Sequence, residues 1–241
     1  MAESSPTPSL LDRLREQSDA LRDEDAVRRK PQDEALADID RRLWKAFKWL
    51  DEALGHLEVI RPQIVHEFRL PPLLTIALPR YEQGFVSYRR KAYSGQELVE
   101  QVEVFYRMTQ EAPIVLKVQP GAASAFEEKL RAAQVPFQYR TEQDDARMVR
   151  HGVFTVTPAV TASISLVPDY RRQVIEVTLR NVDRFESVIL EFTPDKLDEA
   201  ALEDLVRFIL GEANTFLRRA PLAGMRRARA TEVRGSVPVA G

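Results

Sequence analysis

Cysteine is absent from the 241 residues of this chain, and its absence excludes several kinds of chemistry at once. Without thiols the chain can form no disulfide, no thiolate zinc site and no cysteine nucleophile. The three histidines, His56, His66 and His151, lie far apart and lack the spacing of metal ligands. A metal site would therefore depend on carboxylates, and we expect neither a metal nor a cofactor.

Glycine is also scarce, with nine residues scattered along the chain. Loops that cradle phosphates need clustered glycines, because backbone amides must approach the anion, and the chain has neither a P-loop nor a GxGxxG motif. It also has no GxSxG elbow. The acidic clusters, such as Asp144 with Asp145 and Asp195 with Asp198, are those expected of a solvated loop and a helix start. We therefore expect a protein that is not an enzyme.

Long apolar runs are missing as well. No window approaches 18 uninterrupted apolar residues, and the first residues, MAESSPTPSLLDRLREQ, lack the basic and apolar regions of a secretory signal. A formal net charge of −2 provides no overall field toward nucleic acid or an anionic membrane. These features predict a cytoplasmic protein with no membrane partner. The 28 arginines against seven lysines are typical of a GC-rich bacterial genome, so arginine content alone is weak evidence for anion binding.

One strongly patterned helix is expected near the N-terminus. Residues 1–32 are polar, contain three prolines and show only a thin apolar pattern, which predicts a flexible tail. Over residues 33–61 apolar side chains recur every three or four positions, which predicts a long amphipathic helix closed by Pro62. The apolar seam consists of Leu36, Ile39, Leu43, Phe47, Leu50, Leu54 and Leu57, with Trp44 and Trp49 beside it. Such a seam fits the chain's own domain or a coiled coil with a second copy, and the pattern leaves both open.

The pattern changes to that of strands over residues 62–219. Short apolar or alternating segments are separated by turn residues, and helices are expected at 120–134 and from Thr193, each with a proline in its first turn. The chain is therefore predicted to be α+β, with an antiparallel or mixed sheet of about six to seven strands and helices on one face. Residues 220–241 are predicted to form a basic flexible tail.

Two parts of this domain have the same order of elements. VEVFYRM followed by PIVLKVQPGAASAFEEKL can be laid over IEVTLRN followed by SVILEFTPDKLDEAALEDL. Both predict two strands and a helix that starts at a proline, which indicates either an internal strand–strand–helix repeat or a chance similarity. The overall order of elements is similar to that of secretion-chaperone folds, which is a likeness of fold alone.

The strand segments are rich in arginine. The segment GFVSYRRKAYSG places Arg89, Arg90 and Lys91 in a row, and Arg172 follows a later strand. Guanidinium groups bind phosphates bidentately and nearby tyrosines can stack on bases, so Arg89, Arg90 and Arg172 are the candidate anion-binding residues. The competing interpretation is cross-strand pairing with acids such as Glu103.

Strand alternation separates the members of the basic triplet. Arg90 is expected on the same face as Val86 and Tyr88, and Arg89 and Lys91 on the other. An arginine on an apolar face needs a partner for its charge. An acidic partner within the chain would give Arg90 a structural role, and an exposed groove without such a partner would make it a binding residue.

Two hypotheses of function follow. The first is a non-enzymatic cytoplasmic binding or adaptor protein, chaperone-like or scaffold-like, that contacts a protein partner or a second copy through its N-terminal helix. Its candidate contact residues are Leu43, Trp44, Phe47, Trp49 and Leu50. The alternative is an anion-binding regulator that recognises a nucleotide or nucleic acid through the strand arginines.

Overall fold

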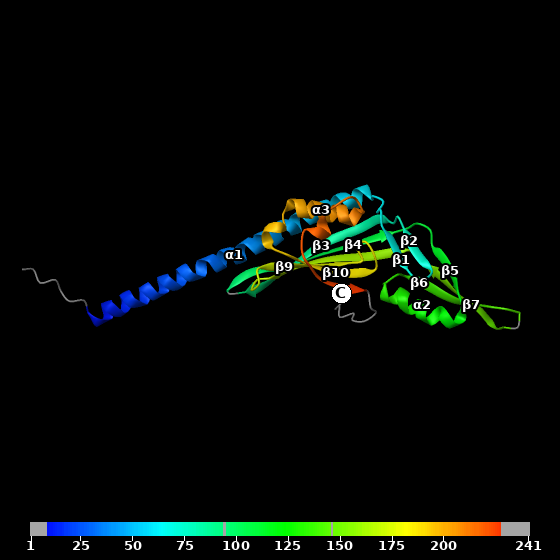
Figure 1. Cartoon of the computed structure of the whole chain (residues 1–241), viewed down its shortest axis with the longest axis horizontal. Coiled ribbons are helices and arrows are strands. Elements are labelled where there is room, and N and C mark those ends of the chain that lie inside the picture. The colour runs from blue at the N-terminus through cyan, green and yellow to red at the C-terminus, as the bar shows by residue number, and fades with distance from the viewer. Residues whose placement is uncertain (1–8, 94, 146, 228–241) are drawn as a thin grey trace, which may run out of the picture.

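The computed structural model describes residues 9–93, 95–145 and 147–227, and it shows a long helix lying across a twisted sheet (Figure 1). The helices are α1 (Leu10–Ile60), α2 (Pro120–Ala132) and α3 (Glu199–Leu210), with short 3-10 turns η1 (Pro194–Lys196) and η2 (Phe216–Arg218). The strands are β1 (Glu67–Leu70), β2 (Leu74–Ala77), β3 (Arg80–Tyr93), β4 (Gln96–Thr109), β5 (Ile114–Val118), β6 (Phe137–Gln143), β7 (Val149–Val156), β8 (Ala159–Asp169), β9 (Val174–Arg180), β10 (Glu186–Phe192) and β11 (Leu222–Arg227).

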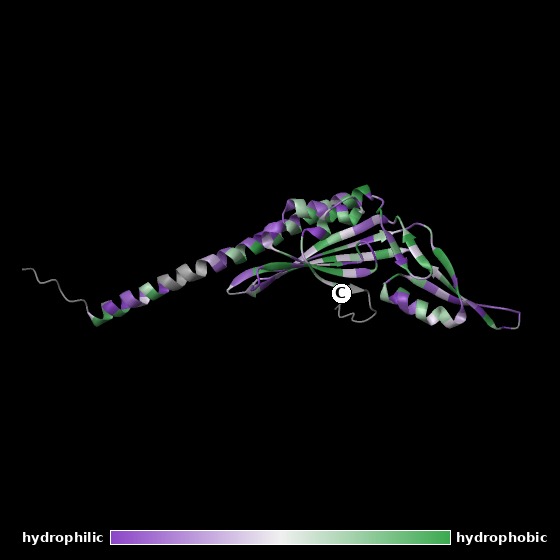
Figure 2. Ribbon diagram, viewed as in Figure 1, coloured by the Kyte–Doolittle hydropathy of each residue, from purple (hydrophilic) through white to green (hydrophobic). Residues whose placement is uncertain are grey.

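The main sheet has six antiparallel strands in the order β11-β10-β9-β8-β4-β3. Its strands alternate between polar and apolar residues, as an antiparallel sheet with one buried face requires (Figure 2). In β4, Val102, Val104, Tyr106 and Met108 are buried. The predicted α+β class and the predicted size of the sheet are thus confirmed.

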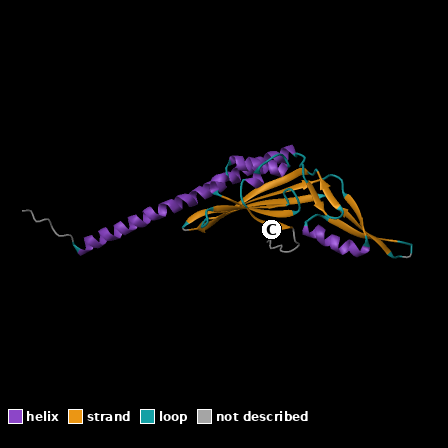
Figure 3. Ribbon diagram, in the orientation of Figure 1, coloured by secondary structure: helices purple, strands orange, loops and turns teal. Residues whose placement is uncertain are grey.

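A smaller unit is inserted between β4 and β8, which are neighbours in the main sheet (Figure 3). It consists of a three-stranded antiparallel sheet, in the order β5-β7-β6, with α2 packed on β7. Phe126 of α2 meets Phe154 of β7 edge to face, with ring centroids 5.1 Å apart. The hairpin of β1 and β2 forms a third, two-stranded sheet. The prediction of a single sheet was therefore incomplete, because periodicity does not show which strands pair.

Helices α1 and α3 lie side by side on one face of the main sheet, and α2 lies against the smaller sheet (Figure 1). Among the side chains of α1 whose burial is described, those of Leu36, Ile39, Leu43, Ala46, Leu50, Leu54 and Leu57 are buried. Each fully buried leucine contributes about 1.5–3 kcal/mol. The predicted seam therefore packs against the chain's own sheet.

The predicted boundary at residue 33 is not a boundary of the helix, since α1 begins at Leu10 and continues through Pro31. Proline removes a backbone donor and usually ends or kinks a helix, which is why the sequence pattern placed the start after it. The C-terminal tail predicted over residues 220–241 is wrong at its start, because Leu222–Arg227 form the edge strand β11 beside β10. The remaining residues, 228–241, lie outside the described part of the chain.

Two further local predictions differ from the structure. The helix expected from Thr193 begins at Glu199, because residues 194–196 form a 3-10 turn and Asp198 is the N-cap, accepting a hydrogen bond from the Ala201 amide at 2.8 Å. The alternating pattern also predicts one strand at about 153–167, and the structure has two strands there, β7 and β8, which belong to different sheets. The proposed repeat stays unconfirmed, since β9 pairs with β10 while β4 and β5 lie in different sheets.

Candidate functional site

The partner of Arg90 is a residue of the helix rather than of a strand. Its Nη2 lies 3.1 Å from Oδ2 of Asp40 in α1, and its guanidinium lies 5.9 Å from the ring centroid of Trp44. Tyr88 completes this cluster, with its ring centroid 5.0 Å from that of Trp44 and 4.7 Å from that of Phe47. The cation is thus held between α1 and β3, where it joins the helix to the sheet.

The other two candidate arginines also have partners within the chain. Arg89 donates a hydrogen bond to the side-chain oxygen of Gln101 on the neighbouring strand. Arg172 donates two parallel hydrogen bonds to Glu191, at 2.8 and 2.9 Å. These bonds lower the pKa of the Glu191 carboxyl below its ordinary value.

The structure does not bring Arg89, Arg90 and Arg172 together. Arg90 lies on the side of β3 that faces α1, whereas Arg89 shares the opposite side of the sheet with Gln101. Arg172 lies in the turn between β8 and β9. The alternation predicted for Arg89 and Arg90 is retained, although a β-bulge shifts the register between them.

The five candidate contact residues of the helix fall into two groups. Leu43 and Leu50 are 0 % exposed and belong to the core. Trp44, Phe47 and Trp49 are half-buried, and the first two belong to the aromatic cluster around Tyr88. A partner could reach the two leucines only by displacing the sheet, because the face that carries them is already covered.

An exposed apolar surface occurs on the same helix, nearer its N-terminus. The N-terminal part of α1 projects beyond the sheet (Figure 1). Its leucines are largely exposed: Leu10 by 66 %, Leu11 by 57 %, Leu14 by 54 % and Leu21 by 64 %. We call these four residues the leucine stripe. The sequence shows them only as a thin pattern, but Leu11, Leu14, Ser18 and Leu21 follow the spacing of 3, 4 and 3 found in heptad repeats.

A groove of about 490 Å³ lies near the end of the sheet where β4 and β8 no longer pair. The side chain of Tyr170 donates a hydrogen bond to the backbone carbonyl of Val99 at 2.7 Å, and its ring centroid lies 5.3 Å from that of Tyr93. Burial raises the pKa of the Tyr170 phenol, so it remains a donor at neutral pH. Three basic and three acidic side chains line the groove, which therefore has no net charge to select an anion.

Comparisons with protein-family models, curated proteins and solved structures find no match to this chain. Its function is therefore inferred from its own surfaces. Within the described residues, no group of three or more His, Cys, Asp or Glu side chains could hold a metal ion. In the same part of the chain, no helix combines the length and apolar content needed to cross a bilayer.

Two buried tyrosines are the most strongly perturbed titratable groups of the core. Tyr81 and Tyr106 stack with ring centroids 6.0 Å apart, and neither hydroxyl has a hydrogen-bond partner in the described chain. Burial raises the pKa of both phenols, with smaller contributions from Glu58 at Tyr81 and from Tyr81 at Tyr106. Both side chains therefore stay neutral at physiological pH and serve as large core residues.

Proposed function

We propose that this chain is a non-enzymatic binding or adaptor protein that associates with a second copy of itself through the leucine stripe of α1. The observation that supports this proposal most directly is the exposure of four leucines on a helical segment that projects beyond the sheet (Figure 1).

The physical reason is that a projecting helix gains no stability from its own domain. Isolated helices are marginal in water, and most helices in proteins are stabilised by packing an apolar face. Between residues 9 and 22 the described side chains are exposed, except that of Ser18, which is half-buried. A second helix laid along the stripe would supply the missing apolar contact.

A second copy suits this surface in two respects. The heptad spacing of Leu11, Leu14, Ser18 and Leu21 is the one that lets two helices interlock their side chains, and a two-fold axis would give both copies the same contact. The segment from Leu10 to Arg22 contains three acidic and three basic residues, so two copies carry no net charge that would drive them apart. Such a dimer would hold two α+β bodies at the ends of a helical junction, as a scaffold requires.

The test is the molar mass of the full chain in solution, measured by light scattering after size-exclusion chromatography. We expect a dimer or larger assembly at micromolar concentration, and a monomer after Leu21→Glu. The matched control is Ala20→Glu, which introduces the same side chain one position away, off the stripe, and should leave the assembly intact. A wild-type chain that is monomeric at every concentration would contradict the proposal, as would equal effects of the two substitutions.

A further inference from the structure

The geometry points to an anion-binding site in a second cavity, at the C-terminal end of α1. We propose that this cavity binds a small molecule carrying a phosphate or carboxylate group, and that Arg61 and Arg80 hold this group. The cavity has a volume of about 610 Å³, within the range of sites for small molecules.

Backbone hydrogen bonds place the two arginines beside the same cavity. Arg61 directly follows α1 and has a positive φ of 49°, which turns the chain away from the helix axis. The next residues then run beside the start of β3: the Pro62 carbonyl accepts a hydrogen bond from the Tyr81 amide at 3.0 Å, and Gln63 bridges to Arg80. Both arginine side chains consequently line one cavity.

These arginines differ from those that the sequence singled out. Arg89, Arg90 and Arg172 are engaged by Gln101, Asp40 and Glu191 respectively. In the described part of the chain, no hydrogen bond or ion pair engages the guanidinium of Arg61 or Arg80. Both are exposed, so an incoming anion would displace only water. An unpaired guanidinium offers the two parallel donors that match a carboxylate or phosphate.

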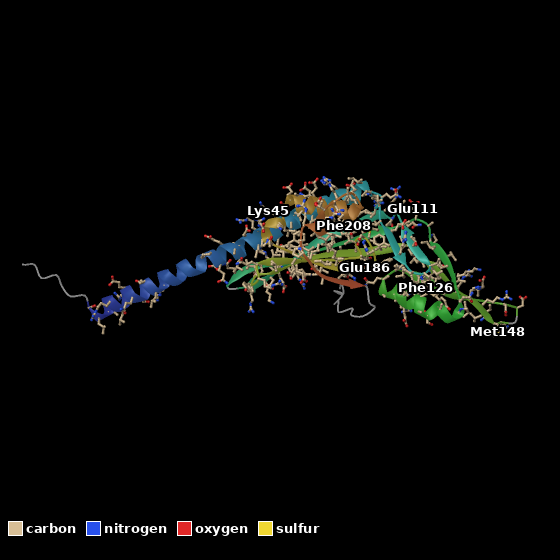
Figure 4. The ribbon with its side chains drawn as sticks, viewed as in Figure 1. Lys45, Glu111, Phe126, Met148, Glu186 and Phe208 are labelled. Atoms are coloured by element: carbon tan, nitrogen blue, oxygen red, sulfur yellow. The ribbon has the colours of Figure 1, made fainter. Side chains whose placement is uncertain are left out.

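The acids that line the cavity do not cancel this charge. Glu82 is held by Arg107, with Nε 3.1 Å from its Oε2. That leaves Glu111, which is labelled in Figure 4, as the acid that lines the cavity together with the two arginines. Gln63 adds a neutral donor, because only one N–H of its amide is used, in a bond of 3.4 Å to the Leu78 carbonyl.

The remaining wall is partly apolar, with Thr109 and Gln110 as its polar members. Ala77, Leu78 and Ala112 line the cavity, and Leu78 is 46 % exposed. A ligand with an anionic group and a small apolar part would therefore find complementary surface for both. The site lies at the opposite end of α1 from the leucine stripe, so it does not depend on self-association (Figure 1).

The site can be tested by isothermal titration calorimetry of the full chain, with inorganic phosphate and citrate in separate titrations at constant ionic strength. We expect saturable binding of at least one anion, and the stronger one indicates whether phosphate or carboxylate is preferred. Arg61→Gln and Arg80→Gln should each weaken that binding about tenfold, since each removes a charged fork. Glu111→Gln should strengthen it, because a competing acid is removed.

The matched control is Arg140→Gln, which removes an exposed arginine of β6 outside the cavity and should leave the affinity unchanged. Thermal melting of each variant shows whether it is folded, and exposed arginines should be replaced without loss of stability. The proposal is overturned if neither anion gives a saturable signal with the wild-type chain. It is also overturned if Arg140→Gln weakens binding as much as Arg80→Gln, because a general charge effect would then explain the signal.

Discussion

The carboxylate of Asp40 accepts a hydrogen bond from the backbone amide of Val99 at 2.7 Å, which ties α1 to β4 at a point where β4 has separated from β8. The Val99 carbonyl accepts a second bond, from Tyr170, so two side chains satisfy both backbone groups. Val99 is fully buried, and a buried polar group without a partner is costly. The helix and the β8–β9 turn therefore compensate for the lost strand pairing.

Replacing Asp40 by alanine should destabilise the fold by about 2–3 kcal/mol, because the Val99 amide and Arg90 would both lose their partner. Urea unfolding of the variant and the wild type measures this difference. Lys91→Ala is the control, since Lys91 is exposed and its nearest acid, Glu100, is 3.7 Å away. If Asp40→Ala lowers the free energy of unfolding no more than this control does, the contacts of Asp40 do not stabilise the fold.

The two groups of leucines in α1 should respond differently to truncation. Leu50→Ala should lower the free energy of unfolding by about 2–5 kcal/mol, because it leaves a cavity under the sheet. Leu14→Ala should change the free energy of unfolding of a dilute monomer by less than about 0.5 kcal/mol, since Leu14 is 54 % exposed. Denaturant titrations at low protein concentration separate the two cases. If both variants lose a similar free energy of unfolding, the N-terminal segment of α1 packs on the rest of the domain.

The fold could be predicted as far as local patterns determine it. The 3.5-residue seam and the alternation in β4 identify a core helix and a half-buried strand, because each records which face is covered. The pairing of strands was beyond this reasoning, since β5 and β7 carry the same kind of residues as β4 and β8. Pro31 also misled the prediction of the helix start, because a helix can continue through a proline when the neighbouring turns hold it.

The candidate sites were harder to predict for a related reason. An arginine becomes a site or an ion pair according to which acids lie near it in space, and the partner of Arg90 is fifty positions away in α1. The alternation nevertheless identified Arg90 as the member of its triplet that needed a partner. Arg61 and Arg80 carried no local signal, because they are brought together by the turn after α1.

Asp204 should make stability depend on pH in the acid range. It is 6 % exposed and accepts hydrogen bonds from the hydroxyl of Thr215 and from Nε of Arg219, the latter at 2.8 Å. These bonds lower its pKa below the ordinary 3.8. The unfolded chain therefore binds the proton more tightly, so the stabilisation is complete above the ordinary pKa and is lost as the pH falls through the lowered one.

Asp204→Asn should consequently be less stable than the wild type at pH 7, and the difference should shrink when both are unfolded with urea near pH 3. Glu52→Gln serves as the comparison, because Glu52 is an exposed residue of α1. If the difference in stability between Asp204→Asn and the wild type stays constant with pH, the Asp204 carboxylate is not the titrating group.

Two glycines in helical surroundings should give opposite results when replaced by alanine. Gly55 lies within α1, is exposed, and has no atom within 4 Å of an added Cβ. Gly55→Ala should therefore stabilise the chain by about 0.5–1 kcal/mol, through helix propensity.

Gly211 ends α3 with a φ of 77°, and an added Cβ would lie 2.7 Å from the Val65 carbonyl oxygen. The Val65 amide also donates to the Leu210 carbonyl at 2.9 Å, so this backbone has little room to move. Gly211→Ala should destabilise the chain by about 1–3 kcal/mol, because alanine is disfavoured in the left-handed region and meets fixed backbone. Thermal melts of both variants measure the contrast. Stabilisation by Gly211→Ala would show that the end of α3 rearranges without cost. The contact between Gly211 and the Val65 backbone would then not fix the segment that leads from α1 to β1.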